Sequence, residues 1–242
     1  MGLTVGMRHV VILAPMPLEM DAITTAFGLS PIGDRQRDAW SGKLGESEVT
    51  AIHIGMGPPL TRKAANLVLD GPRPVDHMMI AGICGGLDSA RPVGTVINPS
   101  SLTLHSTGSS FTHDPPGDVP LEGKLLTTEG VSLDPVLTRG FFDDGFIGVD
   151  MESAALAEVC QQRGIPWSVY RCIGDRPFDG LLDERLVRLS NPDGSGNMAE
   201  IRKLLDAEPD LVPKLEQLGR DASNAARLAA EAAVRGCLAL DR

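Results

Sequence analysis

Short runs of consecutive apolar and β-branched residues recur along the chain and predict buried strands. They lie at residues 9–13, 78–81, 95–98, 147–149 and 167–173. Because these runs are continuous, the sheet that they form is expected to be covered on both faces. Between residues 40 and 54 apolar and polar residues instead alternate around Gly45 and Glu46, which predicts an antiparallel hairpin.

Apolar residues at helical spacing predict helices between these strands. They lie at residues 18–27, 60–69, 151–162 and 211–234. Strands that alternate with helices are typical of an α/β sandwich. Residues 106–123 and 176–196 show no periodicity and are expected to be loops, the second with one turn of helix at about 181–189. With no repeat and no dividing linker in the sequence, we predict a single domain over residues 1–242, with a helical extension at about 198–237.

Charge and cysteine content narrow the class of protein. The chain has 242 residues, and its 22 Lys plus Arg against 32 Asp plus Glu give a net charge of −10, which argues against nucleic-acid or anionic-membrane binding. Its four cysteines form no CxxC pair, which indicates a reducing, cytoplasmic setting. The apolar run at residues 10–16 is too short to span a membrane. His105 and His113 lack the spacing of metal ligands. We therefore expect a small-molecule partner and neither a metal nor a cofactor.

Three segments place acidic residues where predicted strands end. Glu19 follows the first strand, Asp150 and Glu152 follow the fourth, and Asp175 follows the fifth. Open α/β sheets bind ligands at the carboxyl ends of their strands, so these side chains are candidates for one site. Taken alone, Glu19 also fits a first-turn carboxylate that the helix dipole favours.

A glycine cluster, AGICGGLDSARPVG at residues 81–94, follows the second strand. Glycines there allow close approach of a ligand to the backbone, or make a turn. The cysteine Cys84 also matches the GxCxG nucleophile elbow of Cys–His amide hydrolases, which needs a helix directly after the cysteine to lower the thiol pKa. The following LDSARPVGT predicts a loop, so a buried thiol is favoured and a Cys84-dependent hydrolase is kept as an alternative.

Together these segments resemble the family of purine nucleoside phosphorylases and methylthioadenosine/adenosylhomocysteine nucleosidases. The resemblance covers residues 10–177 and rests on VVILAPMPLEMDAI, IHIGMGPPLTRKAANLVL, MMIAGICGGLDSARPVGTVI and VDMESAALAEVCQQRGIPWSVYRCIGD. The last segment is the most specific, with a [DE]ME helix start and a strand ending V-x-R-x-I-x-D. Residues 198–237 and the GI[AC]GGLD form of the glycine cluster also resemble hopanoid-associated phosphorylases, which are thought to act on adenosylhopane.

The resemblance implies a three-layer αβα sandwich around a mixed, partly barrel-like sheet, in a homo-oligomer that cleaves an N-glycosidic bond between ribose and a purine. It assigns Asp175 as the general acid near N7 of the base and Glu19 as the residue that activates water. Glu152 would grip the ribose hydroxyls, with Met151 beside the sugar. The remaining predicted substrate-binding residues are Asp150, Gly55, Gly82, Ile83, Cys84, Gly85 and Phe178.

Departures from the family pattern bear on the nucleophile and the base. The chain lacks the phosphate-binding GDPxR loop of the phosphorylases and has Ile83 where the family has Ser, which favours water over phosphate. A phosphorylase that uses phosphate as co-substrate, with Arg62 or Arg91 as its ligand, and an inactive nucleoside-binding protein remain alternatives. The adenine-clamping Phe-Ile pair is also missing. The resemblance favours adenine as the base. Five phenylalanines are candidates to stack on it: Phe111, Phe141, Phe142, Phe146 and Phe178.

Overall fold

Eleven strands form one mixed sheet in the computed structural model, which describes residues 7–33, 39–131, 133–179, 185 and 188–242. The strands are β1 (Arg8–Ala14), β2 (Ser30–Pro31), β3 (Ala39–Leu44), β4 (Ser47–His53), β5 (His77–Gly86), β6 (Val96–Ile97), β7 (Ser101–Leu104), β8 (Ser110–Thr112), β9 (Lys124–Thr127), β10 (Phe146–Asp150) and β11 (Trp167–Asp175). The helices are α1 (Pro17–Phe27), α2 (Pro58–Leu69), α3 (Pro135–Asp143), α4 (Ser153–Arg163), α6 (Met198–Ala207) and α7 (Val212–Ala239), with 3-10 turns η1 (Pro177–Asp179) and η2 (Pro209–Leu211).

The sheet branches at β5. Along the main path its order is β2-β3-β4-β1-β5-β10-β9-β7-β8, while β11 pairs with β5 and carries β6. The first half of β5 runs parallel to β1, and its last two residues pair antiparallel with β10. β11 runs parallel along nearly the whole of β5. Since parallel and antiparallel pairs both occur, the sheet is mixed, as predicted.

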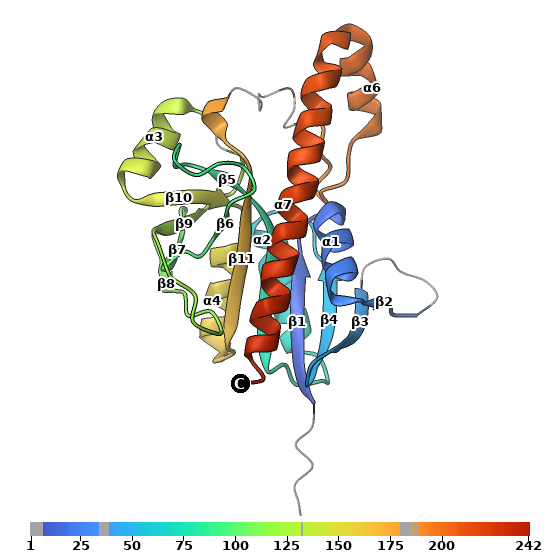
Figure 1. Cartoon of the computed structure of the whole chain (residues 1–242), viewed down its shortest axis with the longest axis vertical. Coiled ribbons are helices and arrows are strands. Elements are labelled where there is room, and N and C mark those ends of the chain that lie inside the picture. Colours follow the sequence, from blue (N-terminus) through green and yellow to red (C-terminus); the bar gives the residue numbers. More distant parts are fainter. Residues whose placement is uncertain (1–6, 34–38, 132, 180–184, 186–187) are drawn as a thin grey trace, which may run out of the picture.

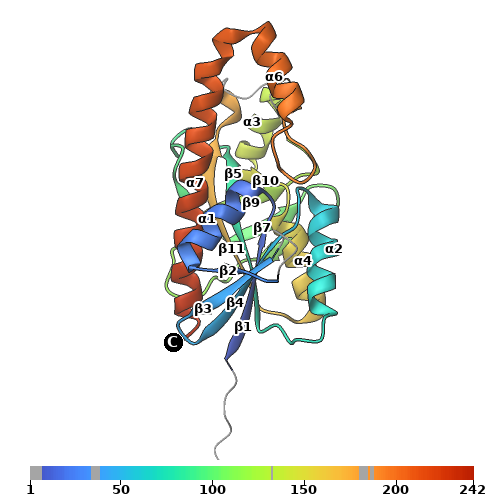
Figure 2. The ribbon, with the colours of Figure 1, turned by 90° about the vertical axis from the view of Figure 1, so that its right-hand side faces the viewer.

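Helices cover both faces of the sheet (Figures 1 and 2). Val10 and Ile12 of β1 pack in one apolar cluster with α1 and α7, whereas Val11 and Leu13 belong to a second cluster with α2 and α4. The alternation follows from the pleat of the strand, which sends successive side chains to opposite faces. The continuous apolar pattern of β1 therefore reports a strand buried on both faces, and the three-layer αβα prediction is confirmed.

The C-terminal helix α7 lies along the sheet through an alanine-rich face. Its buried residues include Ala226, Ala230 and Ala233. Gly236 is needed for close approach, because a Cβ there would lie 1.7 Å from the Tyr170 hydroxyl. The first turns of α7 and the whole of α6 project beyond the sheet (Figure 2).

The structure corrects several predicted boundaries. β5 continues to Gly86, in the first part of the glycine cluster, where a turn had been an alternative. The predicted loop at 106–123 contains β8. Strands β7 and β9 and helix α3 were not predicted. The turn of helix expected at 181–189 falls largely on residues 180–184 and 186–187, which lie outside the described residues. Among the helices described, none has the length and apolar character needed to cross a bilayer.

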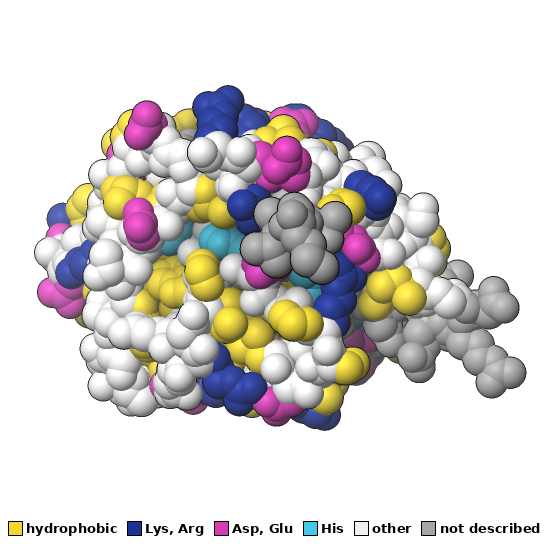
Figure 3. Space-filling model, turned by 90° about the horizontal axis from the view of Figure 1, so that it is seen from below, with side chains coloured by type: hydrophobic (Ala, Val, Ile, Leu, Met, Phe, Trp, Pro, Cys, Tyr) yellow, Lys and Arg dark blue, Asp and Glu magenta, His cyan; other side chains and the backbone are white. Residues whose placement is uncertain are grey.

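Buried histidines lie at the edge of the sheet where β5 and β11 begin. Viewed toward that end of the molecule, histidine side chains show among hydrophobic ones (Figure 3). The His77 Nε2 lies 2.9 Å from the Ser168 hydroxyl. His113 Nε2 accepts from the Val169 amide at 3.1 Å, and its Nδ1 lies 2.9 Å from the Pro99 carbonyl. An amide donor on one nitrogen and a carbonyl on the other fix a neutral imidazole, because a proton on Nε2 would face the Val169 N–H.

We predict that acid destabilises the fold through His77. Burial, assisted by Arg8 and His113, lowers the pKa of His77 to about 4. The unfolded chain takes up a proton near pH ~6.5, so stability falls as the pH is lowered from ~6.5 and the loss is complete below the folded pKa. Urea unfolding between pH 7.5 and 4 should therefore show a smaller fall for His77→Gln than for the wild type. An identical pH dependence in the two proteins would contradict this account.

Candidate active site

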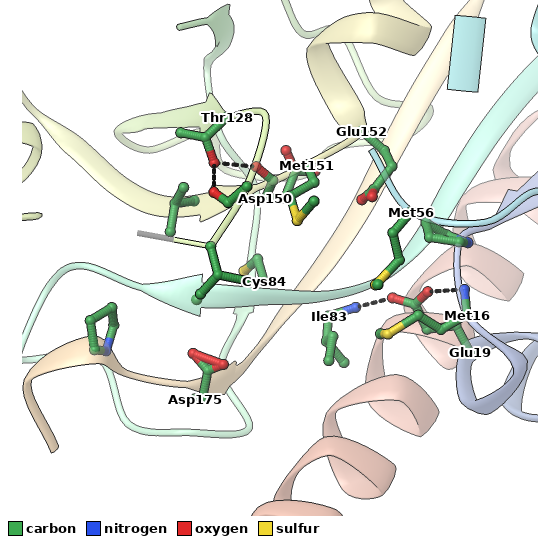
Figure 4. Close-up of a pocket in the computed structure, with 16 residues that line it drawn as sticks. Met16, Glu19, Met56, Ile83, Cys84, Thr128, Asp150, Met151, Glu152 and Asp175 are labelled. Carbon is green, nitrogen blue, oxygen red and sulfur yellow. Dashed lines mark hydrogen bonds between the residues drawn. The ribbon is translucent and has the colours of Figure 1, made fainter. Parts of the chain in front are cut away.

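A cavity of about 160 Å³ opens at the carboxyl ends of the strands. Its lining is largely apolar with a few convergent acids, which is usual for a small-molecule site. It is lined by Pro15, Met16, Glu19, Met56, Ile83, Cys84, Gly85, Thr128, Gly130, Val131, Val149, Asp150, Met151, Glu152, Asp175 and Pro177. The predicted carboxylates from distant parts of the chain thus meet around one hollow (Figure 4).

Glu19 sits in the first turn of α1 and is almost fully buried. Its carboxylate accepts hydrogen bonds from the Met16 amide at 2.9 Å and the Ile83 amide at 2.7 Å (Figure 4). Gly82 makes room for it, since a Cβ at that position would lie 1.9 Å from Glu19 Oε1. Burial raises the pKa of Glu19 to about 7, against the lowering effect of Arg171 and with a further increase from Glu152. Glu19 can therefore exchange a proton near neutral pH.

Arg171 of β11 joins the acidic side chains of the site. Its side chain is completely buried, and its guanidinium lies 2.9 Å from both Asp150 and Glu152 and 3.5 Å from Glu19. It also donates to the Ile83 carbonyl. One cation therefore faces three buried carboxylates. Arg171 was present in the V-x-R-x-I-x-D pattern, but it received no role from the sequence because it lies inside an apolar strand.

Glu152 occupies the N-cap position of α4, but its side chain makes no capping hydrogen bond with that helix. Its carboxylate accepts from the Gly57 amide at 2.8 Å and from Arg171 at 2.9 Å. Burial raises its pKa, Arg171 lowers it, and Asp150 raises it further. Glu152 thus presents a fixed acceptor on the wall of the cavity, beside Met151.

Asp175 ends β11 and differs from the other acids. Among the described residues, no side chain or amide forms a hydrogen bond with its carboxylate, and its pairing partner on the adjacent strand β5 is Gly85. Burial is the main cause that raises the pKa of Asp175 to about 7, and Asp179 adds to it. An unpartnered carboxyl group that is partly protonated near neutrality is suited to donate a proton to a ligand.

Some predicted residues lie elsewhere than expected. Gly55, at φ +80°, packs against Leu60 and Pro192 outside the cavity lining, and the backbone contact to Glu152 comes from Gly57. Gly82 lies behind Glu19 and not on the cavity surface. Ile83 lines the cavity, but its side chain also packs toward α7 beside Cys172, so its amide makes the contact with Glu19.

None of the five phenylalanines lines the cavity, which corrects the expectation for Phe178. The turn η1 leaves Phe178 47% exposed, with its ring 5.2 Å from the Arg176 guanidinium. Phe141, Phe142 and Phe146 form a separate apolar cluster, and Phe111 packs in the core. Unpredicted apolar residues line the cavity instead, among them Met16, Met56 and Val131. Met16 belongs to the segment APMPLE, but its apolar side chain did not indicate a role in ligand binding.

Cys84 lines the cavity within β5, which continues to Gly86. The helix that a nucleophile elbow needs is therefore replaced by strand. Burial raises the thiol pKa well above its ordinary value. The thiolate required for nucleophilic attack is thus disfavoured.

Among the lining residues described, none is Lys, Arg or His. Arg62 pairs with Glu158, and Arg91 pairs with Asp88 and Glu122. Neither of these proposed phosphate ligands reaches the cavity lining. Across the described part of the chain, no group of three or more His, Cys, Asp and Glu side chains is arranged to hold a metal ion.

The chain is similar in sequence to known proteins. The family model described as the phosphorylase superfamily matches residues 9–143. A 5'-methylthioadenosine/S-adenosylhomocysteine nucleosidase of Shewanella halifaxensis is 23% identical over 183 residues, which cover 61% of this chain and 78% of the relative. The nucleosidase of the same name from Bacillus cytotoxicus is 23% identical over 62% of this chain and 80% of its own.

Solved structures show the same fold. The S. pneumoniae 5'-methylthioadenosine/S-adenosylhomocysteine nucleosidase, solved with a transition-state inhibitor, has a TM-score of 0.70 at 16% identity, covering 96% of this chain and 100% of that one. The futalosine hydrolase of Helicobacter pylori has a TM-score of 0.67 at 14% identity, covering 97% of both chains.

We predict that Arg171→Met destabilises the fold by about 3–5 kcal/mol, because it leaves buried carboxylates without their counter-ion. Arg171 lowers the pKa of Glu19 and of Glu152, so its loss raises both. A folded-state pKa above the unfolded one means stability that is present at low pH and lost as the pH rises. The defect should therefore be larger at pH 8 than at pH 5.5.

Chemical denaturation at both pH values measures this effect. Arg62→Met is the matched control, since its partly exposed pair with Glu158 should be worth no more than about 1 kcal/mol. Equal losses in the two variants would refute the central role of Arg171 in the fold.

Proposed function

Because the chain belongs to the phosphorylase superfamily, we propose that it cleaves the N-glycosidic bond of a purine nucleoside, with adenine as the favoured base and water as the nucleophile. The named relatives are nucleosidases, which agrees with hydrolysis. The substrate class follows the family and the relatives; the choice of nucleophile rests on the charge of the cavity.

One observation carries the choice of water. The described lining holds Glu19, Asp150, Glu152 and Asp175 and no cationic side chain. A phosphate dianion needs charge-assisted donors, which this lining does not offer, and carboxylates repel it. The same negative charge favours a sugar that becomes cationic as the bond to the base breaks.

The geometry supports a division of roles among three carboxyl groups. Asp175, in its protonated form, donates its proton to N7 as the C1′–N bond breaks and the base takes the bonding electrons. Glu152 holds the ribose hydroxyls, because its carboxylate is fixed by Gly57 and Arg171. Water attacks C1′, and Glu19 in its carboxylate form takes the proton that the water loses.

We propose further that the protein works in the cytoplasm as a homo-oligomer. The first part is supported by its four cysteines, all of them free thiols. The second is supported by the exposed apolar side chains of Val131, Val136 and Leu137, of which Val136 is 81% exposed.

We predict base release from adenosine-type nucleosides in phosphate-free buffer, at a rate that added phosphate does not increase. Asp175→Asn should lower kcat/KM by about 10²–10⁴-fold, because the leaving base loses its proton donor. Asp70→Asn, on the surface in a pair with Arg163, is the matched control. Chromatographic measurement of free base and of ribose against ribose 1-phosphate reads out the reaction.

The outcomes separate the alternatives. Strict dependence on phosphate, with ribose 1-phosphate as product, would establish a phosphorylase. Calorimetric binding of nucleoside without turnover would establish a binding protein. Loss of all activity in Cys84→Ala, with Asp175→Asn unaffected, would establish a thiol-dependent enzyme.

We predict a bell-shaped pH dependence of kcat/KM with its maximum near pH 7. Asp175 must be protonated, and since its pKa is raised to about 7, activity falls as the pH rises above that value. Glu19 must be ionised, and since its pKa is also raised to about 7, activity falls toward acid. In the residual activity of the variants, Asp175→Asn should flatten the alkaline limb and Glu19→Gln the acidic limb. A wild-type profile that is flat from pH 5.5 to 8.5 would be incompatible with these roles.

A further inference from the structure

The start of α4 is capped in an unusual way. Helix N-termini leave amides without partners inside the helix, and the side chain at the N-cap position normally accepts from one of them. In α4 that position belongs to Glu152, whose side chain makes no capping hydrogen bond and instead faces the cavity. Other residues must satisfy the amides that Glu152 leaves.

Asp150 and Thr127 take over this capping. Asp150 Oδ2 accepts from the Ser153 amide at 3.1 Å, and Thr127 Oγ1 accepts from the Ala154 amide at 2.9 Å. Thr127 lies on β9, directly opposite Asp150 in the parallel pairing of β9 with β10. The strand register therefore places a hydroxyl at the first turn of a helix that follows a different strand.

The Thr127 hydroxyl also holds the acid beside it. It donates to Asp150 Oδ1 at 2.6 Å while accepting from Ala154, so its one proton is used and it is fully buried. Asp150 in turn accepts from Arg171 Nε at 2.9 Å, and Arg171 Nη2 donates to Glu152 at 2.9 Å. A continuous chain of hydrogen bonds thus runs from Thr127 to the carboxylate that faces the cavity.

We propose that Thr127 is a positioning residue, which keeps the Glu152 carboxylate in the cavity by holding Asp150 on Arg171 and by capping α4 in its place. The role in catalysis rests on the proposed function, in which Glu152 holds the ribose. Without the hydroxyl, the Ala154 amide loses its acceptor, and Glu152 occupies the N-cap position, from which a side chain normally accepts such an amide. Glu152 then turns back onto the helix and leaves both Gly57 and the sugar.

Thr127→Val tests this proposal, since valine keeps the shape and removes the hydroxyl. Amide hydrogen exchange of the full chain, followed by NMR, should show at least about tenfold faster exchange at Gly57, whose N–H donates to Glu152 Oε1. Amides in the middle of α4, such as that of Val159, should keep their protection. Thr127→Ser, which retains the hydroxyl, should restore Gly57.

Activity gives a second, independent readout. For Thr127→Val, kcat/KM should fall at least about tenfold, the usual effect of losing a buried hydrogen bond to a charged group. Thr127→Ser should recover most of it. Thr138→Val is the matched control, because Thr138 is also buried but donates to backbone carbonyls within α3. In a Glu152→Gln background, Thr127→Val should cost little more, since the two residues act through one group.

Each outcome decides a separate question. Unchanged Gly57 exchange in Thr127→Val overturns the positioning role, whatever the activity. Faster Gly57 exchange together with a wild type that cleaves no nucleoside upholds the positioning of Glu152 and rejects the proposed function. Faster exchange with full activity in Thr127→Val overturns the catalytic significance of the chain of hydrogen bonds.

Discussion

Arg171 places a single positive charge between three carboxylates in the part of the molecule that water does not reach. A charge buried in this way is costly unless it is paired and fully hydrogen-bonded. Here its partners come from α1, from the end of β10 and from the N-cap position of α4. The guanidinium therefore ties distant parts of the chain together at one point. The acids outnumber it, so the cluster favours protonated carboxyl groups, and burial acts in the same direction on Glu19 and Glu152.

The charge distribution also accounts for what the cavity selects. The Arg171 guanidinium lies behind the cavity lining and is already paired with three carboxylates. The surface offered to a ligand is therefore acidic and apolar. Such a surface suits a neutral molecule that gains positive charge during reaction. It is poorly suited to an anionic second reactant. In our proposal, the cluster of Arg171 and its carboxylates therefore both stabilises the fold and favours water over phosphate as the nucleophile.

Much of this site could be predicted because short sequence patterns, each an apolar strand followed by an acidic residue, indicated where its acids lie. Glu19, Glu152 and Asp175 lie at or shortly after the ends of the apolar strands β1, β10 and β11, and α/β sheets bind ligands at the carboxyl ends of their strands. Arg171 could not be assigned from its surroundings, since only the three-dimensional structure shows which acids meet it. Thr127 received no predicted role either, because a threonine in a short strand predicts nothing about a helix that begins 26 residues later. The strands β7 and β9 have four residues each, which is too short for a recognisable period of apolar residues. The phenylalanine candidates were wrong because the sequence does not show toward which part of the molecule an aromatic side chain points.

The central strand β5 supports one wall of the cavity through its main chain. The Ile83 amide holds Glu19, Gly82 leaves room behind that acid, and Gly85 lies beside Asp175. A wall of this kind offers few side chains that mutation can alter, and enlarging Gly82 would displace the acid that it accommodates. Met16, Ile83, Gly57 and Arg171 hold Glu19 and Glu152, whereas the turn after β9 adds Thr128, Gly130 and Val131 to the lining. Substitutions in that turn would therefore reshape the cavity and leave these two acids in place.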